Sequence, residues 1–236
     1  DGGHRWDRFI TDTLGQYVEF VPVCPEVECG LGVPREAMRL VGDPDAPRLV
    51  TVRTKVDLTD RMAAWTRKRV EDLEQEDLRG FIFKSKSPSS GMERVRVYSE
   101  TAQGSPVLRG VGMFARAFVR HFPLLPVEED GRLNDDRLRE NFIESVFVHR
   151  HFRDLVAESS GRGALVDFHA RHKLLLLAHS QEHYRRMGRC VANLPQDLHE
   201  AYQGYGVLLA EKHFEEPPVR VEAGRIEDGV VRLEKA

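Results

Sequence analysis

The sequence predicts an α/β protein, with an N-terminal open sheet and flanking helices at residues 1–126 and a mainly α-helical domain at residues 127–236. In the first part, short apolar runs end in loops rich in Gly, Pro or Ser and alternate with amphipathic stretches, as strands and helices do in α/β domains. In the second part, apolar residues recur at helical spacing. Pro123 and Pro126, followed by the acidic segment EEDGR, which we interpret as a linker, mark the boundary near residue 126.

Composition and charge exclude several classes of protein. A chain of 236 residues, 41% hydrophobic and 31% charged, can bury a substantial core. Its formal net charge of -3 gives no global attraction to nucleic acid, so we expect no DNA partner. No run approaches the roughly 18 apolar residues of a membrane helix. The N-terminus shows no signal-peptide pattern, so we expect a cytoplasmic protein without a membrane partner. A homo-oligomer is compatible with these data.

The first motif is VPVCPEVECGLGVPREAMR, which begins at Val21. Residues 20–23 are an apolar run typical of a buried strand, and Pro25 should prevent a helix in the following turn. Cys24 is therefore expected at a strand end, where ligands bind in open α/β sheets. Pro34 and Glu36 are typical of the first turn of a helix, which we expect to continue through Leu40.

The next elements are a strand at residues 48–52 and an amphipathic helix at residues 60–77. The basic run at residues 67–69 is either a nucleic-acid patch or a solvated face, and the acidic residues that follow it favour the solvated face. Further strands are expected at residues 80–83 and 95–98, and a helix at residues 110–121.

The loop KSKSPSSGM follows the strand at residues 80–83 and combines cations, hydroxyls and a glycine. This composition suits an anion or a polar heterocycle. We therefore predict substrate binding by Lys84, Lys86, Ser87 and Ser89.

The second part should begin with a helix capped by Asn134, and a long helix should cover residues 164–192. Four histidines would lie within an arc of roughly 80° on that helix; they are His169, His172, His179 and His183. This stripe is either a metal site or a polar packing surface. The ligand spacing favours packing, and we predict no zinc there. The segment from about residue 194 ends in two Val-rich runs that predict a short hairpin.

Two thiols and a carboxylate stand together in the first motif. Cys24 and Cys29 are four residues apart and Cys190 is remote, so neither a disulfide framework nor a structural zinc site is predicted. Cys29 is either an inert buried thiol or a substitute metal ligand. Glu26 follows Cys24 by two residues, and a carboxylate in a partly desolvated site can serve in general acid/base transfer. A cysteine hydrolase would need a partner histidine, and none stands in a recognisable motif.

Five segments of the sequence resemble known families. DGGHRWD, CPEVECGLGVPR and KSKSPSSGMERVRVY resemble the thiouracil desulfidase (TudS-like) family. FPLLPVEEDGRLNDDRLRENF and FHARHKLLLLAHSQEHY resemble the YbgA-type domain that is often fused to it. Together they lie within about residues 1–193.

The resemblance implies a site at which three cysteines from three loops hold a [4Fe-4S] cluster, whose fourth iron accepts sulfur from a thiolated pyrimidine. Cys24 matches one ligand position, Ser90 occupies a position that is normally cysteine, and the first cysteine would precede Asp1. A hydroxyl is a poor iron ligand beside a thiolate, so we expect impaired cluster binding. The resemblance gives Glu26 the role of transferring a proton to the pyrimidine. We expect Cys24 and Ser90 to lie close together.

Three hypotheses follow. The chain is an iron–sulfur-dependent desulfidase of a thiolated pyrimidine, free or within RNA; or a cluster-free protein that binds a nucleobase or nucleotide; or a partner-docking protein that uses the histidine helix. The loop at residues 1–4 is either a terminal turn or part of the site.

Overall fold

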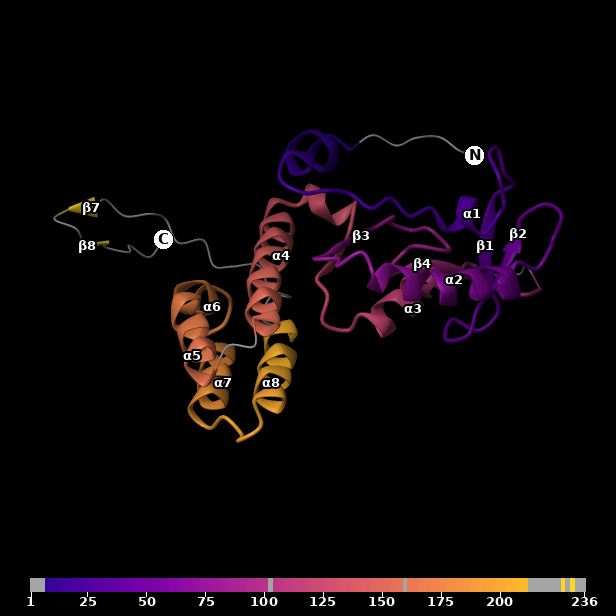
Figure 1. Cartoon of the computed structure of the whole chain (residues 1–236). Helices are drawn as coiled ribbons and strands as arrows, with labels where there is room; N and C mark the ends of the chain where they lie inside the picture. The colour runs from indigo at the N-terminus through magenta and orange to yellow at the C-terminus, as the bar shows by residue number, and fades with distance from the viewer. Residues whose placement is uncertain (1–6, 102–103, 159–160, 212–225, 228–229, 232–236) are drawn as a thin grey trace. The chain divides into compact units, whose positions relative to one another are not determined.

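The computed structural model describes residues 7–101, 104–158, 161–211, 226–227 and 230–231. The expected loop at residues 1–4 lies outside the described residues. The chain divides into two compact units, Asp1–Asn134 and Asp135–Ala236, and each is described by itself (Figure 1). In the described part of the chain, no helix is both long and apolar enough to cross a membrane.

The first unit contains both strands and helices, in mixed order along the chain. Its helical segments are η1 (Phe9–Thr13), η2 (Leu14–Gln16), α1 (Pro25–Glu28), α2 (Thr59–Glu74), α3 (Met113–His121) and η3 (Arg132–Asn134). Its strands are β1 (Met38–Val41), β2 (Arg48–Thr51), β3 (Phe81–Phe83), β4 (Val95–Tyr98), β5 (Val107–Gly110) and β6 (Val127–Glu129).

Four of these strands form a mixed sheet in the order β2-β1-β4-β5. Strand β1 pairs antiparallel with β2 and parallel with β4, and β4 pairs antiparallel with β5. The remaining two strands, β3 and β6, form a separate parallel pair. The predicted strands at residues 48–52, 80–83 and 95–98 are confirmed, as is the predicted fold class.

Two apolar clusters hold this unit together. One packs Leu40 of β1 and Leu49 of β2 against Met62 of α2. The other packs aromatic side chains of β3 and α3; the Phe83 and Phe118 rings meet edge to face with centroids 5.4 Å apart. Aromatic pairs in this arrangement add to the stabilisation from buried area. The structure thereby fixes α3 beside the loop that leaves β3.

Three predictions around the first motif are wrong. Residues 20–23 form no strand, and Pro25 starts the short helix α1 instead of preventing one. Proline is tolerated at the first helical position because the amide proton that it lacks has no partner there. The expected helix after Pro34 is also wrong, because Met38–Val41 is strand β1. Pairing with β2 and β4, both distant from the Pro34 turn in sequence, overrides the local helix signal.

The acidic segment after Pro126 is not a linker in the structure. Val127–Glu129 forms strand β6, parallel to β3, and both Glu128 and Glu129 are buried. Strand β5 was not predicted, and the predicted helix at residues 110–121 begins only at Met113.

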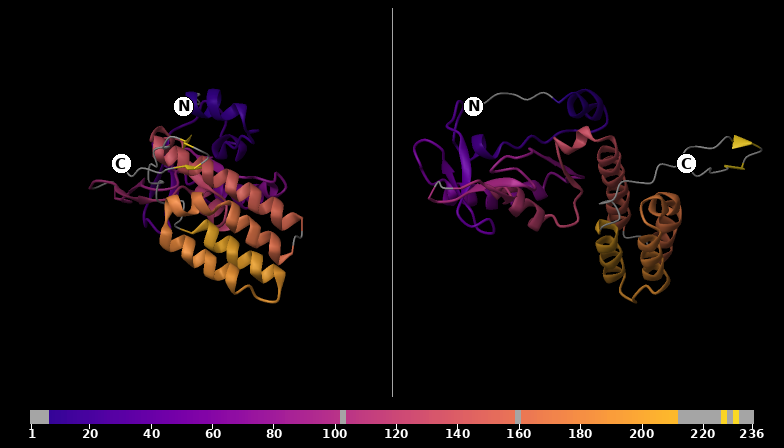
Figure 2. Two further views of the ribbon diagram at one scale, coloured as in Figure 1. Left: turned by 90° about the vertical axis from the view of Figure 1, so that its left-hand side faces the viewer. Right: turned by 180° about the vertical axis from the view of Figure 1, so that it is seen from behind.

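The second unit is helical, with a small antiparallel strand pair, β7 (Ile226–Glu227) and β8 (Val230–Val231), in the segment for which a short hairpin was predicted. Its helices pack side by side around one apolar core (Figure 2). They are α4 (Asp136–Ala157), α5 (Arg162–Arg171), α6 (Lys173–His179), α7 (Gln181–Ala192) and α8 (Leu198–Ala210).

The prediction of one long helix at residues 164–192 is wrong, because this segment forms three helices, α5, α6 and α7. Helix α5 ends at Arg171 with His172 as its cap, and Ser180 has an extended backbone and accepts a hydrogen bond from the His183 amide as the cap of α7. The four histidines therefore do not share one helix face. The cap of α4 is Asp135, not Asn134. Helix α8 covers a segment for which no further helix was predicted.

Candidate functional site

The turn that carries Cys24 is fastened to helix α2 by polar contacts. Cys24 is the cap of α1, and its amide donates to Oε1 of Glu28 at 2.8 Å. The other oxygen of Glu28 lies 3.0 Å from the guanidinium of Arg69 on α2. Arg61, also on α2, donates to the carbonyl oxygens of Cys29 and Gly30 at 2.7 Å each. These contacts fix where α1 presents its side chains.

Glu26 lies at the centre of the candidate site. Its Oε1 accepts a hydrogen bond from the hydroxyl of Ser89 at 2.5 Å. Its Oε2 is 3.7 Å from Sγ of Cys24 and 3.6 Å from the guanidinium of Arg35. The side chain is only 12% exposed. One oxygen thus contacts the serine-rich loop and the other contacts the thiol.

The serine loop, residues 84–91, brings three hydroxyls together. The hydroxyls of Ser87 and Ser89 are 2.9 Å apart, and those of Ser89 and Ser90 are 3.4 Å apart. Ser89 and Ser90 are both buried. The Ser87 hydroxyl also accepts hydrogen bonds from the amides of Ser89 and Ser90, at 3.3 and 3.2 Å. The loop therefore presents a compact hydroxyl cluster beside Glu26.

The backbone of the serine loop caps the N-terminus of helix α3. The carbonyl of Ser89 accepts hydrogen bonds from the amides of Phe114 and Ala115, at 2.9 and 3.2 Å. These amides belong to the first turn of α3, whose donors lack partners within the helix. A Cβ atom on Gly112 would lie 2.5 Å from the carbonyl carbon and oxygen of Ser89, so only glycine permits this approach.

The contacts link Cys24 to Ser90 through Glu26 and Ser89, although Cys24 caps α1 and does not follow a strand as predicted. The lysines differ from the serines. Lys84 and Lys86 are exposed, and the ammonium of Lys84 pairs with Asp130 at 2.6 Å. Their predicted part in substrate binding stays a prediction.

Cys29 lies beside the same turn. Its side chain is buried and its Sγ is 3.4 Å from the carbonyl oxygen of Glu26. Burial raises the pKa of the Cys29 thiol, although the positive charge of Arg61 opposes the increase. Cys29 is therefore protonated at neutral pH. Burial also raises the pKa of Cys190, which is remote in sequence and packs against the core of the second unit.

Sequence reasoning missed the arginines and two carboxylates that support the site. Arg35 contacts Glu26, while Arg61 and Arg69 belong to a mixed-charge helix in which nothing distinguishes them from solvated residues. Glu129 and Asp130 stand in the segment interpreted as a linker. The one available signal was that Glu128 and Glu129 follow an apolar run directly, a position that is compatible with a buried strand.

The four histidines of the predicted stripe have separate partners. His179 contacts Glu144 at 2.9 Å, and His183 contacts the Leu208 carbonyl at 2.6 Å. His169 lies 3.1 Å from the Tyr205 hydroxyl, and His172 contacts the Phe168 carbonyl at 2.8 Å. Among the described residues, no three His, Cys, Asp or Glu side chains are grouped so that they could hold a metal ion. Absence of zinc remains a prediction.

Comparison with known proteins gives a match for each part of the chain. The family model described as 2-thiouracil desulfurase matches residues 1–130. A second model, described as Protein of unknown function (DUF1722), matches residues 173–222. It extends well past residue 194.

One curated relative and one solved structure are also similar. "Uncharacterized protein YbgA" of Escherichia coli (strain K12) is 36% identical over 75 residues, 31% of this chain and 44% of that protein. The chain thus spans less than half the length of the curated relative that it matches. A solved [4Fe-4S]-dependent thiouracil desulfidase, TudS, has 25% identity and a TM-score of 0.42, over 53% of this chain and 77% of that one.

Proposed function

The chain belongs to the 2-thiouracil desulfurase family, and we propose that it removes sulfur from a thiolated pyrimidine at the group formed by Cys24, Glu26 and the serine loop. The net reaction replaces C=S by C=O, consumes one water and releases one H₂S. The observation that supports this site most directly is the Ser89–Glu26 contact, which joins the two loops that carry the family motifs.

Glu26 is the proposed proton-transfer group. A general acid or base must lie within hydrogen-bond reach of the proton that it moves, and its protonation must suit the working pH. Oε1 is held by the Ser89 hydroxyl, so Oε2, which faces Cys24 and Arg35, is the oxygen free to exchange a proton with the pyrimidine. Ser89 thereby orients the carboxylate.

The serine loop is the proposed substrate-binding segment. The hydroxyl of Ser87 can donate to or accept from the polar edge of a pyrimidine, whereas Ser89, whose single proton goes to Glu26, can contribute only its oxygen as an acceptor. Lys84 and Lys86 complete the proposed set as exposed cations. Lys84 would have to leave Asp130 before it could contact a ligand.

The ligand set for a [4Fe-4S] cluster is a separate question. Cys24 offers a thiolate, whereas Ser90 offers a hydroxyl, which binds iron weakly beside thiolates. In the described ranges, no three-residue group is placed to hold a metal ion. These residues do not fit a cluster held by three thiolates, and we assign no step of the reaction to one.

Sulfide release from 2-thiouracil tests the proposal. The purified chain should release sulfide and form uracil in equal amounts, slowly because Ser90 stands where the family pattern has a cysteine, and the thiocarbonyl absorbance should fall at the same rate. Glu26→Gln should lower the rate by roughly 10²- to 10⁴-fold, as for loss of a general acid or base. Glu71→Gln, the same substitution at an exposed position of α2, should leave it unchanged. Equal rates for the wild type and Glu26→Gln would exclude Glu26 from the reaction.

A binding protein without turnover is the second candidate, because the hydroxyl of Ser90 stands where the family pattern has a thiol. In that case 2-thiouracil and uracil should both bind with no sulfide released. A third set of measurements compares free 2-thiouracil with a short RNA that contains one thiolated uridine. Sulfide from the RNA alone would identify a thiolated RNA base as the substrate.

A further inference from the structure

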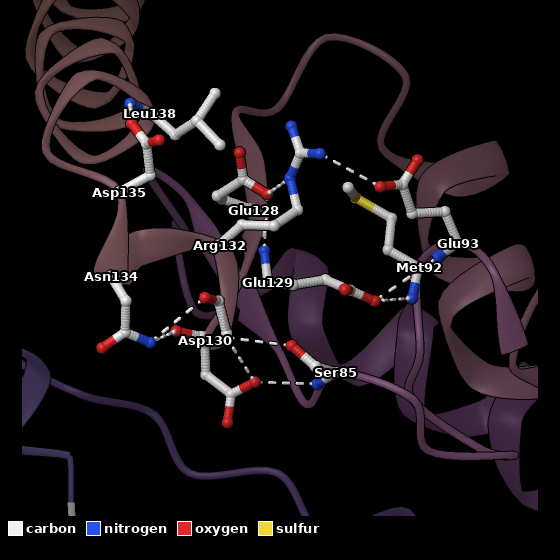
Figure 3. Close-up of polar contacts among 11 residues, drawn as sticks. Ser85, Met92, Glu93, Glu128, Glu129, Asp130, Arg132, Asn134, Asp135 and Leu138 are labelled. Atoms are coloured by element: carbon white, nitrogen blue, oxygen red, sulfur yellow. Dashed lines mark hydrogen bonds and ion pairs between the residues drawn. The ribbon is translucent and has the colours of Figure 1, made fainter.

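Two neighbouring carboxylates hold the two ends of the serine loop (Figure 3). Where the loop begins, Oδ1 of Asp130 accepts a hydrogen bond from the Ser85 amide at 2.8 Å, and Oδ2 pairs with the Lys84 ammonium at 2.6 Å. Just beyond its other end, Oε1 of Glu129 accepts from the Met92 amide at 2.7 Å. Both carboxylates come from β6 and the residue directly after it.

The amino-acid types at these positions are unusual for a short strand. Glu128 and Glu129 are 6% and 5% exposed, and glutamate is almost never fully buried without partners. Arg132 donates to Glu128 at 2.7 Å, whereas Glu129 accepts from backbone amides of the serine-loop end. In a strand that pairs with Phe81–Phe83, apolar residues would be sufficient for packing. Burial alone therefore does not explain the carboxylates.

Asp130 is charged at neutral pH. Burial by itself raises its pKa, but hydrogen bonds from Lys84 and Ser85 outweigh burial and hold the pKa below the ordinary value of 3.8. Gly131 reinforces the same end of the loop, because its amide donates to the Ser85 hydroxyl at 2.9 Å. Each contact joins the segment after β6 to the segment after β3, and the two strands are themselves paired in parallel.

We propose that Glu129 and Asp130 are positioning residues of the desulfuration site, which hold both ends of the serine loop so that the Ser89 hydroxyl meets Glu26. This inference rests on the proposed function. If either end is released, the Ser89 hydroxyl can shift away from Oε1 of Glu26. A misplacement of about 1 Å at a reacting group can cost on the order of 10²-fold in rate.

Kinetics of Glu129 variants test this assignment. Glu129→Ala should lower kcat by about 10²-fold. Glu129→Gln should be only about tenfold slower than the wild type, because its amide oxygen can accept the same hydrogen bond from the Met92 amide. Glu128→Gln is the matched control: it changes a buried carboxylate of the same strand, and its amide oxygen can still accept from the Glu129 amide and Arg132, so kcat should be kept even if stability falls.

A double variant separates positioning from general destabilisation. If Glu129 acts through Ser89, the loss from Glu129→Ala should shrink to about twofold or less when Ser89→Ala is already present, since coupled residues are not additive. The same fold-loss in both backgrounds would overturn the proposal.

Limited trypsin digestion provides a readout that needs no substrate. Lys84 and Lys86 are exposed in the loop, so Glu129→Ala and Asp130→Ala should each speed cleavage after these lysines by about tenfold, and Glu128→Gln should not. If the wild type releases no sulfide while these variants are cleaved faster, the proposed function fails and the two residues still hold the loop. Unchanged cleavage in both alanine variants would overturn the loop assignment whatever the activity.

Discussion

The hydroxyl of Ser89 and the carboxylate of Glu26, 63 residues apart in the sequence, lie 2.5 Å from each other. This contact places the serine loop against the turn of Cys24 and defines the orientation of the carboxylate. Three predictions depend on this contact or on the elements around it, and a fourth concerns the second unit.

Ser89→Ala should lower the rate of sulfide release by about ten- to a hundredfold, because Glu26 loses the hydrogen bond that orients it. The free energy of unfolding should fall by about 1 to 3 kcal/mol, because the substitution leaves an oxygen of a mostly buried carboxylate without this donor. Ser99→Ala removes an exposed hydroxyl that bonds Thr101 and should leave the rate at the wild-type value. The measurements are steady-state kinetics and urea unfolding, and an unaffected rate in Ser89→Ala would contradict the proposed orientation.

Ser90→Cys should increase the iron and acid-labile sulfide that the chain retains after anaerobic reconstitution, because a thiolate is a far better iron ligand than a hydroxyl. The increase should disappear when Cys24→Ser is added. Ser99→Cys introduces an exposed thiol and serves as the control for non-specific iron binding. Equal iron retention by the Ser90→Cys and Ser99→Cys variants would remove position 90 from the proposed ligand set.

Gly112→Ala should destabilise the first unit by about 1 to 3 kcal/mol, because the new methyl group would overlap the Ser89 carbonyl. Trp65, which packs beside Phe114, reports unfolding of this unit by fluorescence. Gly163→Ala, on α5 with open space around it, should leave the Trp65 transition unchanged. An unaltered unfolding midpoint for Gly112→Ala would mean that the loop and α3 can separate at little cost.

The second unit should lose stability as pH falls below 6.5. Burial lowers the pKa of His169, and burial is also the main reason why the pKa of His172 is lowered. The unfolded chain therefore takes up protons at 6.5, before the folded unit does, so stability is present above that pH and is lost as pH falls toward the folded pKa values. Thermal unfolding followed by circular dichroism should show this slope, and His169→Gln should reduce it. A slope that is unchanged in that variant would assign the dependence to other groups.

Sequence patterns predicted the elements whose signals are local. Helix α2 shows an amphipathic period and β4 a β-branched alternation, and both form where expected. Strand β1 was missed because Pro34 and Glu36 imitate a helix start, while the partners that make it a strand lie elsewhere in the chain. The break at Ser180 was missed for a related reason, since packing of separate helices decides it.

In the candidate site, too, sequence patterns predicted the local relationships and missed the long-range contacts. The motif alone placed Cys24 beside Glu26, because two residues of one turn must be close. The meeting of the two loops was expected only from the resemblance, and the contact of Arg35 with Glu26 was not predicted at all. No pattern in a single sequence marks an arginine that a tertiary contact brings to a carboxylate.

The Ser89 carbonyl, which receives the first amides of α3, has a consequence for how this site diversifies. The loop backbone cannot move without uncapping a helix whose Phe114 and Phe118 lie in the core. The side chain at position 90 does not hold the backbone in this way, so a hydroxyl and a thiol can replace one another there while the backbone stays in place. Descendants of one ancestral chain can thus inherit the geometry of the loop unchanged and differ in the chemistry that it offers.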